Sequence, residues 1–142
     1  MIKLTLIIFL FYIFANISFA EDSFFDEAKE KFIQKKYEVS KFLFQRSIVF
    51  NPQDKNSYLY LAKIYKIEEN KKEEEKNINT VLLLDPKDEE ATYMLMEIEL
   101  NKSNYSKVKK LTETFSKICK NMCEKETLIL DSLKNIEPKN ES

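Results

Sequence analysis

The sequence of 142 residues contains neither glycine nor histidine. Without glycine, the phosphate-cradling loops of Walker and dinucleotide-binding motifs are excluded, and tight β-hairpins lose their usual turn residue. Without histidine, the commonest general base and the commonest zinc ligand are missing. These absences disfavour an enzyme, and we predict no catalytic residues, no metal site and no cofactor.

The charges are nearly balanced and are interleaved along the chain. Charged residues make up 33% of the sequence and hydrophobic residues 44%, and the net charge is −1. This length and composition suit one domain with a continuous core. Because no large basic face is evident, nucleic acid is not an expected partner, and no small-molecule substrate is predicted either.

Residues 1–20 have the pattern of a secretory signal peptide. Lys3 precedes an apolar run from Leu4 to Ala15, and Ser18 and Ala20 supply small residues at positions −3 and −1 of a cleavage site. We therefore predict cleavage after Ala20 and a periplasmic or secreted protein. The alternative is an uncleaved inner-membrane anchor, although the run is shorter than the about 20 residues that a spanning helix needs.

The remainder of the chain is periodic. Pro52 and Pro86 each close an apolar segment and lie 34 residues apart, which is the period of a helix-turn-helix repeat. Proline stops a helix because it lacks an N–H group and clashes with the preceding turn. Asp54 and Asp88 follow the two prolines, so we predict that each caps the next helix.

The segment between the prolines carries an apolar stripe at helical spacing, formed by Tyr58, Leu61, Ala62 and Tyr65. With Ile78, Val81 and Pro86, this unit resembles the tetratricopeptide repeat family. A first unit is in phase with it and has family-like residues at Phe24, Ala28, Tyr37, Ser40, Phe44, Ser47 and Pro52. A third unit follows from Glu89, with Leu95, Tyr105, Val108 and Phe115 in place.

The resemblance implies an all-α fold, a right-handed α-solenoid of three helix pairs with a C-terminal capping helix. The expected pairs are residues 21–54, 55–88 and 89–122, the last being degenerate. The capping helix is expected over residues 123–137, with Ile129, Leu133 and Ile136 on its buried face, because an exposed apolar edge needs covering. A disordered tail is expected over residues 138–142.

Some residues depart from the family pattern. Glu27 and Lys31 stand where apolar residues are expected, and Met96 replaces a small residue. We expect looser packing within the helix pairs that contain them. Glu74 also replaces a small residue, and the same looser packing is expected in its pair. We interpret its charged run, Lys71 to Lys76, as a solvated first turn and a half of a helix.

In this family the first helix of each pair lines a concave groove that holds peptides. The resemblance therefore implies a partner-binding groove at Phe25, Lys29, Leu59, Tyr60, Lys63, Tyr93, Met94 and Glu97. Aromatic side chains would supply contact area, and Lys29 and Lys63 would select acidic groups. The alternative is that some of these residues pack between neighbouring pairs and that the lysines are solvated. A clamp for the acidic tails of chaperones is disfavoured, because only Lys29 suits it and the other clamp positions hold Phe25, Tyr60, Glu90 and Met94.

Cys119 and Cys123 are the only cysteines. An even count in an oxidising compartment predicts a disulfide, which would pin the turn before the final helix. Free thiols, or a chemical role for the pair, remain alternatives.

We therefore expect a non-enzymatic scaffold of the cell envelope that binds a protein or peptide segment. The alternatives are a membrane-anchored, self-associating structural subunit and a thiol/disulfide accessory protein.

Overall fold

The computed structural model describes residues 24–136, and this range contains helices and no strand. A first helix covers residues 24–33. It is followed by α2 (Tyr37–Phe50), α3 (Lys55–Ile67), α4 (Lys71–Leu84), α5 (Glu89–Asn101), α6 (Tyr105–Ile118) and α7 (Glu124–Ile136). The predicted signal peptide, the predicted tail and the side chain of Ile136 lie outside the described residues.

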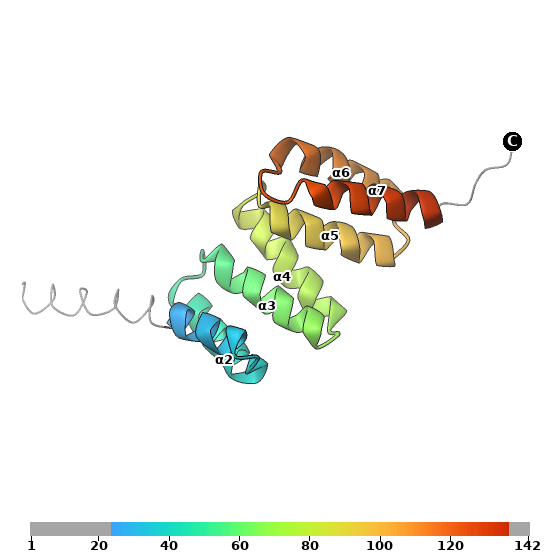
Figure 1. The fold of residues 1–142 in the computed structure, drawn as a ribbon. Coiled ribbons are helices and arrows are strands. Elements are labelled where there is room, and N and C mark those ends of the chain that lie inside the picture. The colour runs from blue at the N-terminus through green and yellow to red at the C-terminus, as the bar shows by residue number, and fades with distance from the viewer. Residues whose placement is uncertain (1–23, 137–142) are drawn as a thin grey trace, which may run out of the picture.

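The helices stack in chain order (Figure 1). Each of α2 to α6 packs on the helix that follows it, and α7 closes the array against both α5 and α6. The predicted α-solenoid of three helix pairs and a capping helix is therefore confirmed for the described residues.

The turn inside each helix pair has one residue in the left-handed region, and none of the three is glycine. Lys35, Glu69 and Ser103, with φ of 59°, 58° and 59°, recur every 34 residues. After each of them, the next backbone N–H donates to a carbonyl five residues earlier, as from Asn70 to Tyr65 at 2.9 Å. This is the Schellman arrangement that ends many helices, and in this glycine-free chain it is built from less suitable residues.

The turns between pairs contain the predicted helix caps. The Asp54 carboxylate accepts from the backbone N–H groups of Asn56 and Ser57, and the Asp88 carboxylate accepts from that of Ala91. Each cap satisfies helix N–H groups that have no partner within the helix. Both capping predictions are thus confirmed, and they fix where α3 and α5 begin.

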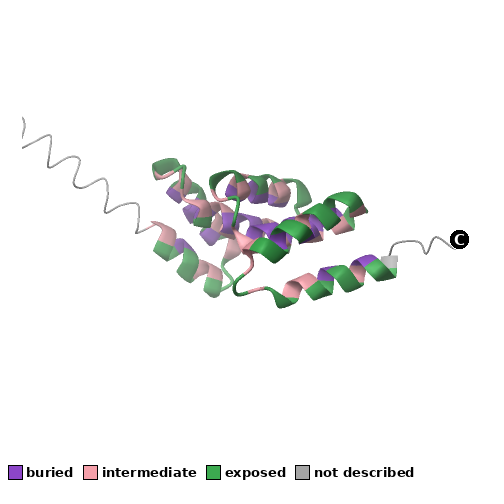
Figure 2. Ribbon diagram, turned by 90° about the horizontal axis from the view of Figure 1, so that it is seen from above, coloured by how far each residue is buried: buried purple, intermediate pink, exposed green. Residues whose placement is uncertain are grey.

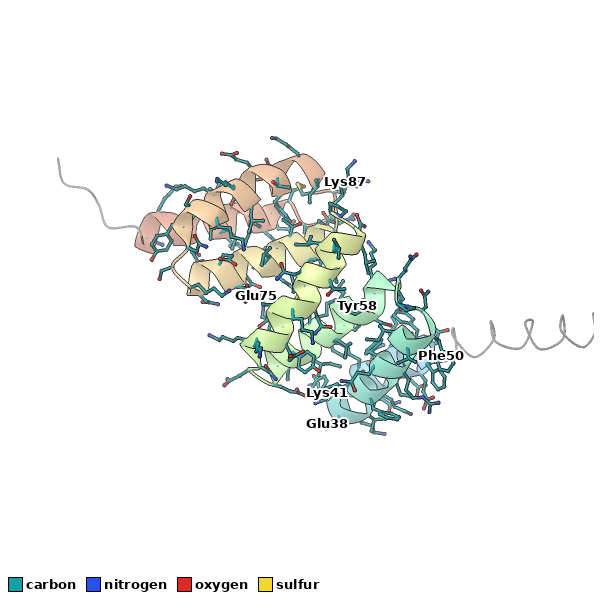
Figure 3. All side chains as sticks on the ribbon, turned by 180° about the vertical axis from the view of Figure 1, so that it is seen from behind. Glu38, Lys41, Phe50, Tyr58, Glu75 and Lys87 are labelled. Carbon is teal, nitrogen blue, oxygen red and sulfur yellow. A yellow bond between two sulfur atoms is a disulfide. The ribbon has the colours of Figure 1, made fainter. Side chains whose placement is uncertain are left out.

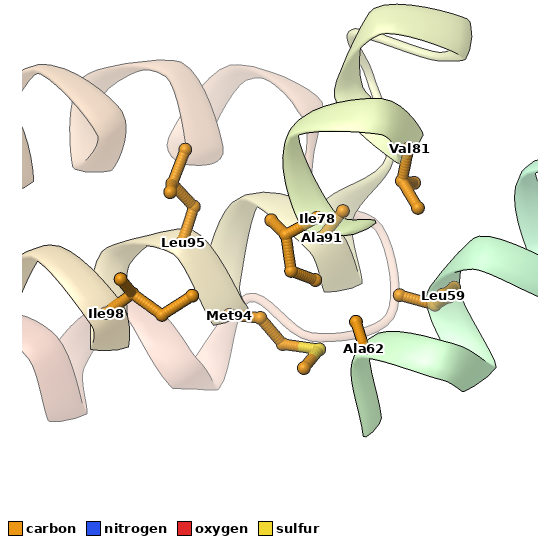
Figure 4. Close-up of a cluster of buried hydrophobic side chains, with 8 residues drawn as sticks. All are labelled: Leu59, Ala62, Ile78, Val81, Ala91, Met94, Leu95 and Ile98. Carbon is orange, nitrogen blue, oxygen red and sulfur yellow. The ribbon is translucent and has the colours of Figure 1, made fainter. Parts of the chain in front are cut away.

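Three apolar clusters hold the array together, and buried residues gather on the inward faces of the helices (Figure 2). The first cluster surrounds Phe44, between the first pair and α3. The second joins α3, α4 and α5 (Figure 4) and consists of Leu59, Ala62, Ile78, Val81, Ala91, Met94, Leu95 and Ile98. The third places Ile129 and Leu133 of α7 against Met96, Val108 and Phe115, so α7 covers the last pair as expected.

Two expectations about the departures from the family pattern are wrong. Met96 is fully buried in the third cluster, where its flexible side chain packs with Val108 and Phe115 instead of disturbing the core. Glu74 is not solvated: only 6% of it is exposed, because it occupies an inward position of α4. Its neighbours Lys71, Lys72 and Lys76 are exposed, as predicted.

None of the helices within residues 24–136 combines the length and the apolar character needed to cross a membrane.

Candidate functional site: a groove along the first helices

A groove of about 400 Å³ runs along the first helices of the three pairs. Its lining comprises Phe32, Lys63, Lys66, Ile67, Glu90, Tyr93, Met94, Glu97 and Met122. All of these except Met122 lie on the first helix of a pair, which is the side that lines the concave face of such arrays. We call this set of residues the groove.

Helical spacing brings these side chains to one face. On α3, Lys63, Lys66 and Ile67 lie at i, i+3 and i+4, and on α5, Glu90 and Tyr93 lie three residues apart. Residues at this spacing are neighbours on a helix surface. The turns at Asn51-Pro52 and Asp85-Pro86 lie 34 residues apart, so α3 and α5 begin at equivalent points of successive repeats. These two residue sets therefore face each other across the space between α3 and α5.

Ion pairs cross this gap. The Lys63 ammonium lies 2.9 Å from the carboxylate of Glu90, and the Lys66 ammonium lies 2.6 Å from that of Glu97. The Tyr93 hydroxyl donates to Glu97 at 3.2 Å. Burial, followed by the charge of Glu97, raises the pKa of Tyr93 above its usual value, so this hydroxyl stays protonated. Lys63 and Lys66 therefore already have acidic partners from this chain.

The loop between α6 and α7 forms one wall. The Glu89 carboxylate accepts from the backbone N–H of Lys120 at 2.7 Å and from that of Asn121 at 3.1 Å. The bond from Lys120 is the main reason that the pKa of Glu89 falls below its usual value. These bonds hold the loop against the start of α5 and bring Met122 into the groove. Lys125 of α7 lies 5.8 Å from the centre of the Tyr93 ring.

Cys119 and Cys123 flank this loop. Their Cα atoms are 5.3 Å apart and their sulfur atoms lie at bonding distance. The geometry therefore permits the predicted bridge, which would brace the loop that carries Met122. Its formation in the natural compartment stays a prediction.

Two further hollows adjoin the groove. One of about 380 Å³ shares Glu90 and Met122 with it and extends toward Lys55 and Asp88. The other, of about 440 Å³, shares Lys66 and Glu97 and extends toward the start of α4. The three hollows therefore adjoin one another through shared lining residues.

The predicted site residues fall into three groups. Lys63, Tyr93 and Glu97 line the groove, and their contact with a partner stays a prediction. Leu59 and Met94 are only 8% and 5% exposed, because they pack in the cluster between the second and third pairs. Each adds only a small exposed part to the lining of a hollow. The alternative of packing between neighbouring pairs therefore describes most of each side chain, and their contact with a partner stays a prediction.

Phe25, Tyr60 and Lys29 lie elsewhere. Phe25 and Tyr60 pack around Phe44, with ring centres 5.7 Å and 4.9 Å from it, so the alternative of packing between pairs holds for both. Tyr60 also lies beneath the ammonium of Lys63, 4.8 Å from its ring centre. Lys29 is exposed on the first helix and is not among the groove residues.

The prediction missed Phe32, Lys66, Ile67 and Met122. The first three lie three or four residues beyond Lys29 and Lys63, one helical turn along the same face, so extending the stripe by one turn would have found them. Met122 lies in a loop whose position depends on Glu89, so no local sequence pattern predicts that Met122 lines the groove.

Within residues 24–136, no group of three or more Cys, Asp or Glu side chains is placed to hold a metal ion.

No protein-family model and no curated protein matches the chain in sequence. Solved structures match it in fold. The first TPR domain of Spaghetti (RPAP3), bound to the HSP90 peptide SRMEEVD, has a TM-score of 0.73 at 14% identity over 83% of this chain and 94% of that one. The second TPR domain of human RPAP3, in complex with an HSP70 peptide, gives 0.71 at 19% identity over 83% and 98%.

A third match is the Yersinia enterocolitica type III secretion chaperone SycD, solved with a peptide of the translocator YopD. Its TM-score is 0.69 at 16% identity over 80% of this chain and 89% of that one. At these identities the likeness establishes the fold, and the chain has the TPR-like fold.

Proposed function

We propose that this chain is a non-enzymatic scaffold that holds a peptide segment of another protein in the groove. The observation that carries the proposal is the groove itself, with the partly exposed apolar side chains Phe32, Ile67, Tyr93 and Met122 along one continuous face. Concave, mostly apolar surfaces with a few polar groups are the usual ligand sites of proteins. The RPAP3 and SycD structures were solved with peptides, which supports a peptide as the ligand class here.

The ion pairs in the groove indicate which segment it accepts. An acidic peptide would have to compete with Glu90 for Lys63 and with Glu97 for Lys66. Apolar side chains, in contrast, gain contact area against Ile67 and Tyr93 without breaking an ion pair. We therefore propose that apolar side chains supply most of the affinity, which revises the expectation that Lys63 selects acidic groups.

Replacing Ile67 by serine is expected to weaken peptide binding about 10-fold, because Ile67 is 49% exposed and lines the groove. Ligands would be selected from a phage-displayed peptide library on the immobilised full chain. Their affinities for the wild type and the variant would then be compared by fluorescence anisotropy.

The matched control is Leu83→Ser. Leu83 is 82% exposed near the end of α4 and does not line the groove. This variant is expected to bind the selected peptides as tightly as the wild type. Equal affinity of the Ile67→Ser variant, with its circular dichroism unchanged, would contradict the proposed site, as would a library that yields no binding peptide.

The acidic peptide SRMEEVD is expected to bind this chain with a Kd weaker than about 1 mM. Glu90 faces Lys63 in the groove, and the other positions of a chaperone-tail clamp are packed in the core or apolar. Titration calorimetry would measure binding, with the first TPR domain of Spaghetti as the positive control. Micromolar binding by this chain would contradict this expectation and show that an acidic ligand displaces Glu90 and Glu97 from Lys63 and Lys66.

We further propose that the chain acts outside the cytoplasm, after cleavage at Ala20, within an assembly of the cell envelope. The support is the pattern of residues 1–20. The alternative is an anchored structural subunit that associates with further copies of itself. The intact mass of the protein from its native host separates the two, because a chain that begins at Glu21 supports export and one that retains Met1 supports the anchor.

The cysteine bridge is proposed as structural. Ellman's reagent is expected to titrate no thiol in the unfolded, unreduced protein from its native compartment, and two thiols would contradict the bridge. A thiol/disulfide accessory role is the alternative, and the reduction potential discriminates it, because catalytic disulfides are much easier to reduce than structural ones.

A further inference from the structure

Glu74 occupies an unusual place in the solenoid. It lies on the inward face of α4, and 94% of the residue is buried, since 6% is exposed. No residue in the described part of the chain donates a hydrogen bond to its carboxylate or forms an ion pair with it. No fully buried side-chain oxygen or nitrogen in the described residues lacks a hydrogen-bond partner, so the unpartnered Glu74 carboxylate must keep some contact with solvent. Little of the residue is exposed, so hydration of this carboxylate is restricted, and a partner from outside the chain could stabilise it.

The Glu74 side chain lines the hollow of about 440 Å³ that adjoins the groove. The lining comes from three helices and two turns and comprises Lys66, Glu69, Lys71, Glu74, Glu97, Ile98, Asn101 and Lys102. This volume is large enough for several water molecules or for one long side chain. We call this hollow the Glu74 cavity.

The lysines that line the cavity do not neutralise Glu74. Lys66 is bound to Glu97 at 2.6 Å, and Lys102 is bound to Glu75, labelled in Figure 3, at 2.5 Å. Lys71 lies on the exposed start of α4, and no ion pair joins it to Glu74. Burial raises the pKa of Glu74, and the charges of Lys66 and Lys71 only partly offset this effect. The carboxylate would therefore be stabilised by a cation from outside the chain.

We propose that the Glu74 cavity binds an arginine side chain of the segment held in the groove. A guanidinium presents a planar fork of N–H donors that matches a carboxylate, and its stem would lie against Ile98. The amide oxygen of Asn101 is a second acceptor in the lining. The cavity meets the groove at the Lys66–Glu97 pair, so one bound segment can reach both.

The source of the arginine rests on the proposed function, but the cavity can be tested alone with a small probe. N-acetyl-arginine amide would be titrated into the ¹⁵N-labelled full chain and followed by heteronuclear NMR. Saturable shifts are expected at the backbone amides of Glu74, Ile98 and Lys102, with a Kd of about 1–10 mM. N-acetyl-citrulline amide, which has the same shape without the charge, is expected to produce none.

The decisive variant is Glu74→Gln, which is expected to raise the Kd of the probe at least about 10-fold, because it removes the charge and keeps the size. Glu73→Gln is the matched control, since Glu73 is adjacent on α4 and pairs with Lys76 outside the cavity. Equal binding by the Glu74→Gln variant, equal binding of the citrulline amide, or no saturable shift in the wild type would overturn the proposal.

Peptide binding in the groove and arginine binding in the Glu74 cavity can be refuted independently of each other. The Ile67→Ser variant is expected to bind the arginine probe normally, because Ile67 does not line the cavity. Probe binding without peptide binding would leave the Glu74 cavity standing and refute the proposed function. Peptide binding without probe binding would support the proposed function and refute the arginine site in the Glu74 cavity.

Discussion

The Phe44→Ala variant is expected to lose about 3–5 kcal/mol of unfolding free energy. Phe44 is fully buried at the centre of the first cluster. Its ring stacks on Tyr60 of α3 at 4.9 Å and meets Phe25 of the first helix edge-on at 5.7 Å. Removing the ring opens a cavity where the first pair joins the second pair. Urea denaturation followed by circular dichroism would measure the loss.

The loss should be concentrated at one end of the array. Each unit of a solenoid contacts only its neighbours, so a weakened terminal junction unfolds before the rest. Amide hydrogen exchange is expected to rise most in the first helix and α2. The matched control is Phe42→Ala on the same helix: Phe42 is 56% exposed, and the expected change is within about 0.5 kcal/mol. A loss below about 1 kcal/mol for Phe44→Ala would show that this junction does not hold the first pair in place.

The Glu99→Gln variant is expected to lose about 1–3 kcal/mol at pH 7. Glu99 is only 2% exposed, and its carboxylate accepts from Lys107 at 2.8 Å and from Asn104 at 2.9 Å. These bonds join the end of α5 to the start of α6. An amide in this place keeps an acceptor but loses the charge that strengthens both bonds. Urea denaturation of the two proteins at pH 7 would give the difference.

The difference in unfolding free energy between the wild type and the Glu99→Gln variant should depend on pH. Burial alone would raise the pKa of Glu99, but the bonds from Lys107 and Asn104 outweigh burial and hold the pKa below its usual value of 4.5. A lowered pKa means that the charged form is stabilised on folding, so the contribution is full above about pH 4.5 and disappears as the pH falls through the lowered pKa. The difference between wild type and variant should therefore vanish in strong acid.

The control for Glu99 is Glu113→Gln on the exposed face of α6. It is expected to change stability by less than about 0.5 kcal/mol at either pH. A Glu99→Gln difference that is equally large in strong acid would contradict the ionic origin of this contribution.

The sequence was sufficient to predict the fold because its signals are local and repeated. Pro52 and Pro86 end helices wherever they stand, and Asp54 and Asp88 cap the helices that follow. The alternation of large and small residues around Ala62 marks the contact between the two helices of a pair, and Ala62 is fully buried there. Each of these effects acts within a few residues, so no knowledge of the neighbouring units is needed.

How far individual side chains are buried could not be predicted from the repeat pattern. Leu59 and Tyr93 hold the same position in successive repeats, yet Leu59 is buried and Tyr93 is half-exposed. The difference depends on which side chains the next pair places opposite them, and the repeat pattern does not contain that information. Glu74 is the sharpest case, because a charged run is normally solvated, and its burial follows only from the packing of α3, α4 and α5.

The central claim is that the groove holds a peptide segment, and locating a bound peptide tests it most directly. A photoreactive benzoyl-phenylalanine would be placed at position 67 in one preparation and at position 83 in another, and each would be irradiated with a library-selected peptide. If the groove is the binding site, mass spectrometry should find peptide cross-linked through position 67 and not through position 83. Cross-linking through position 83 alone would place the ligand on α4 outside the groove and contradict the account.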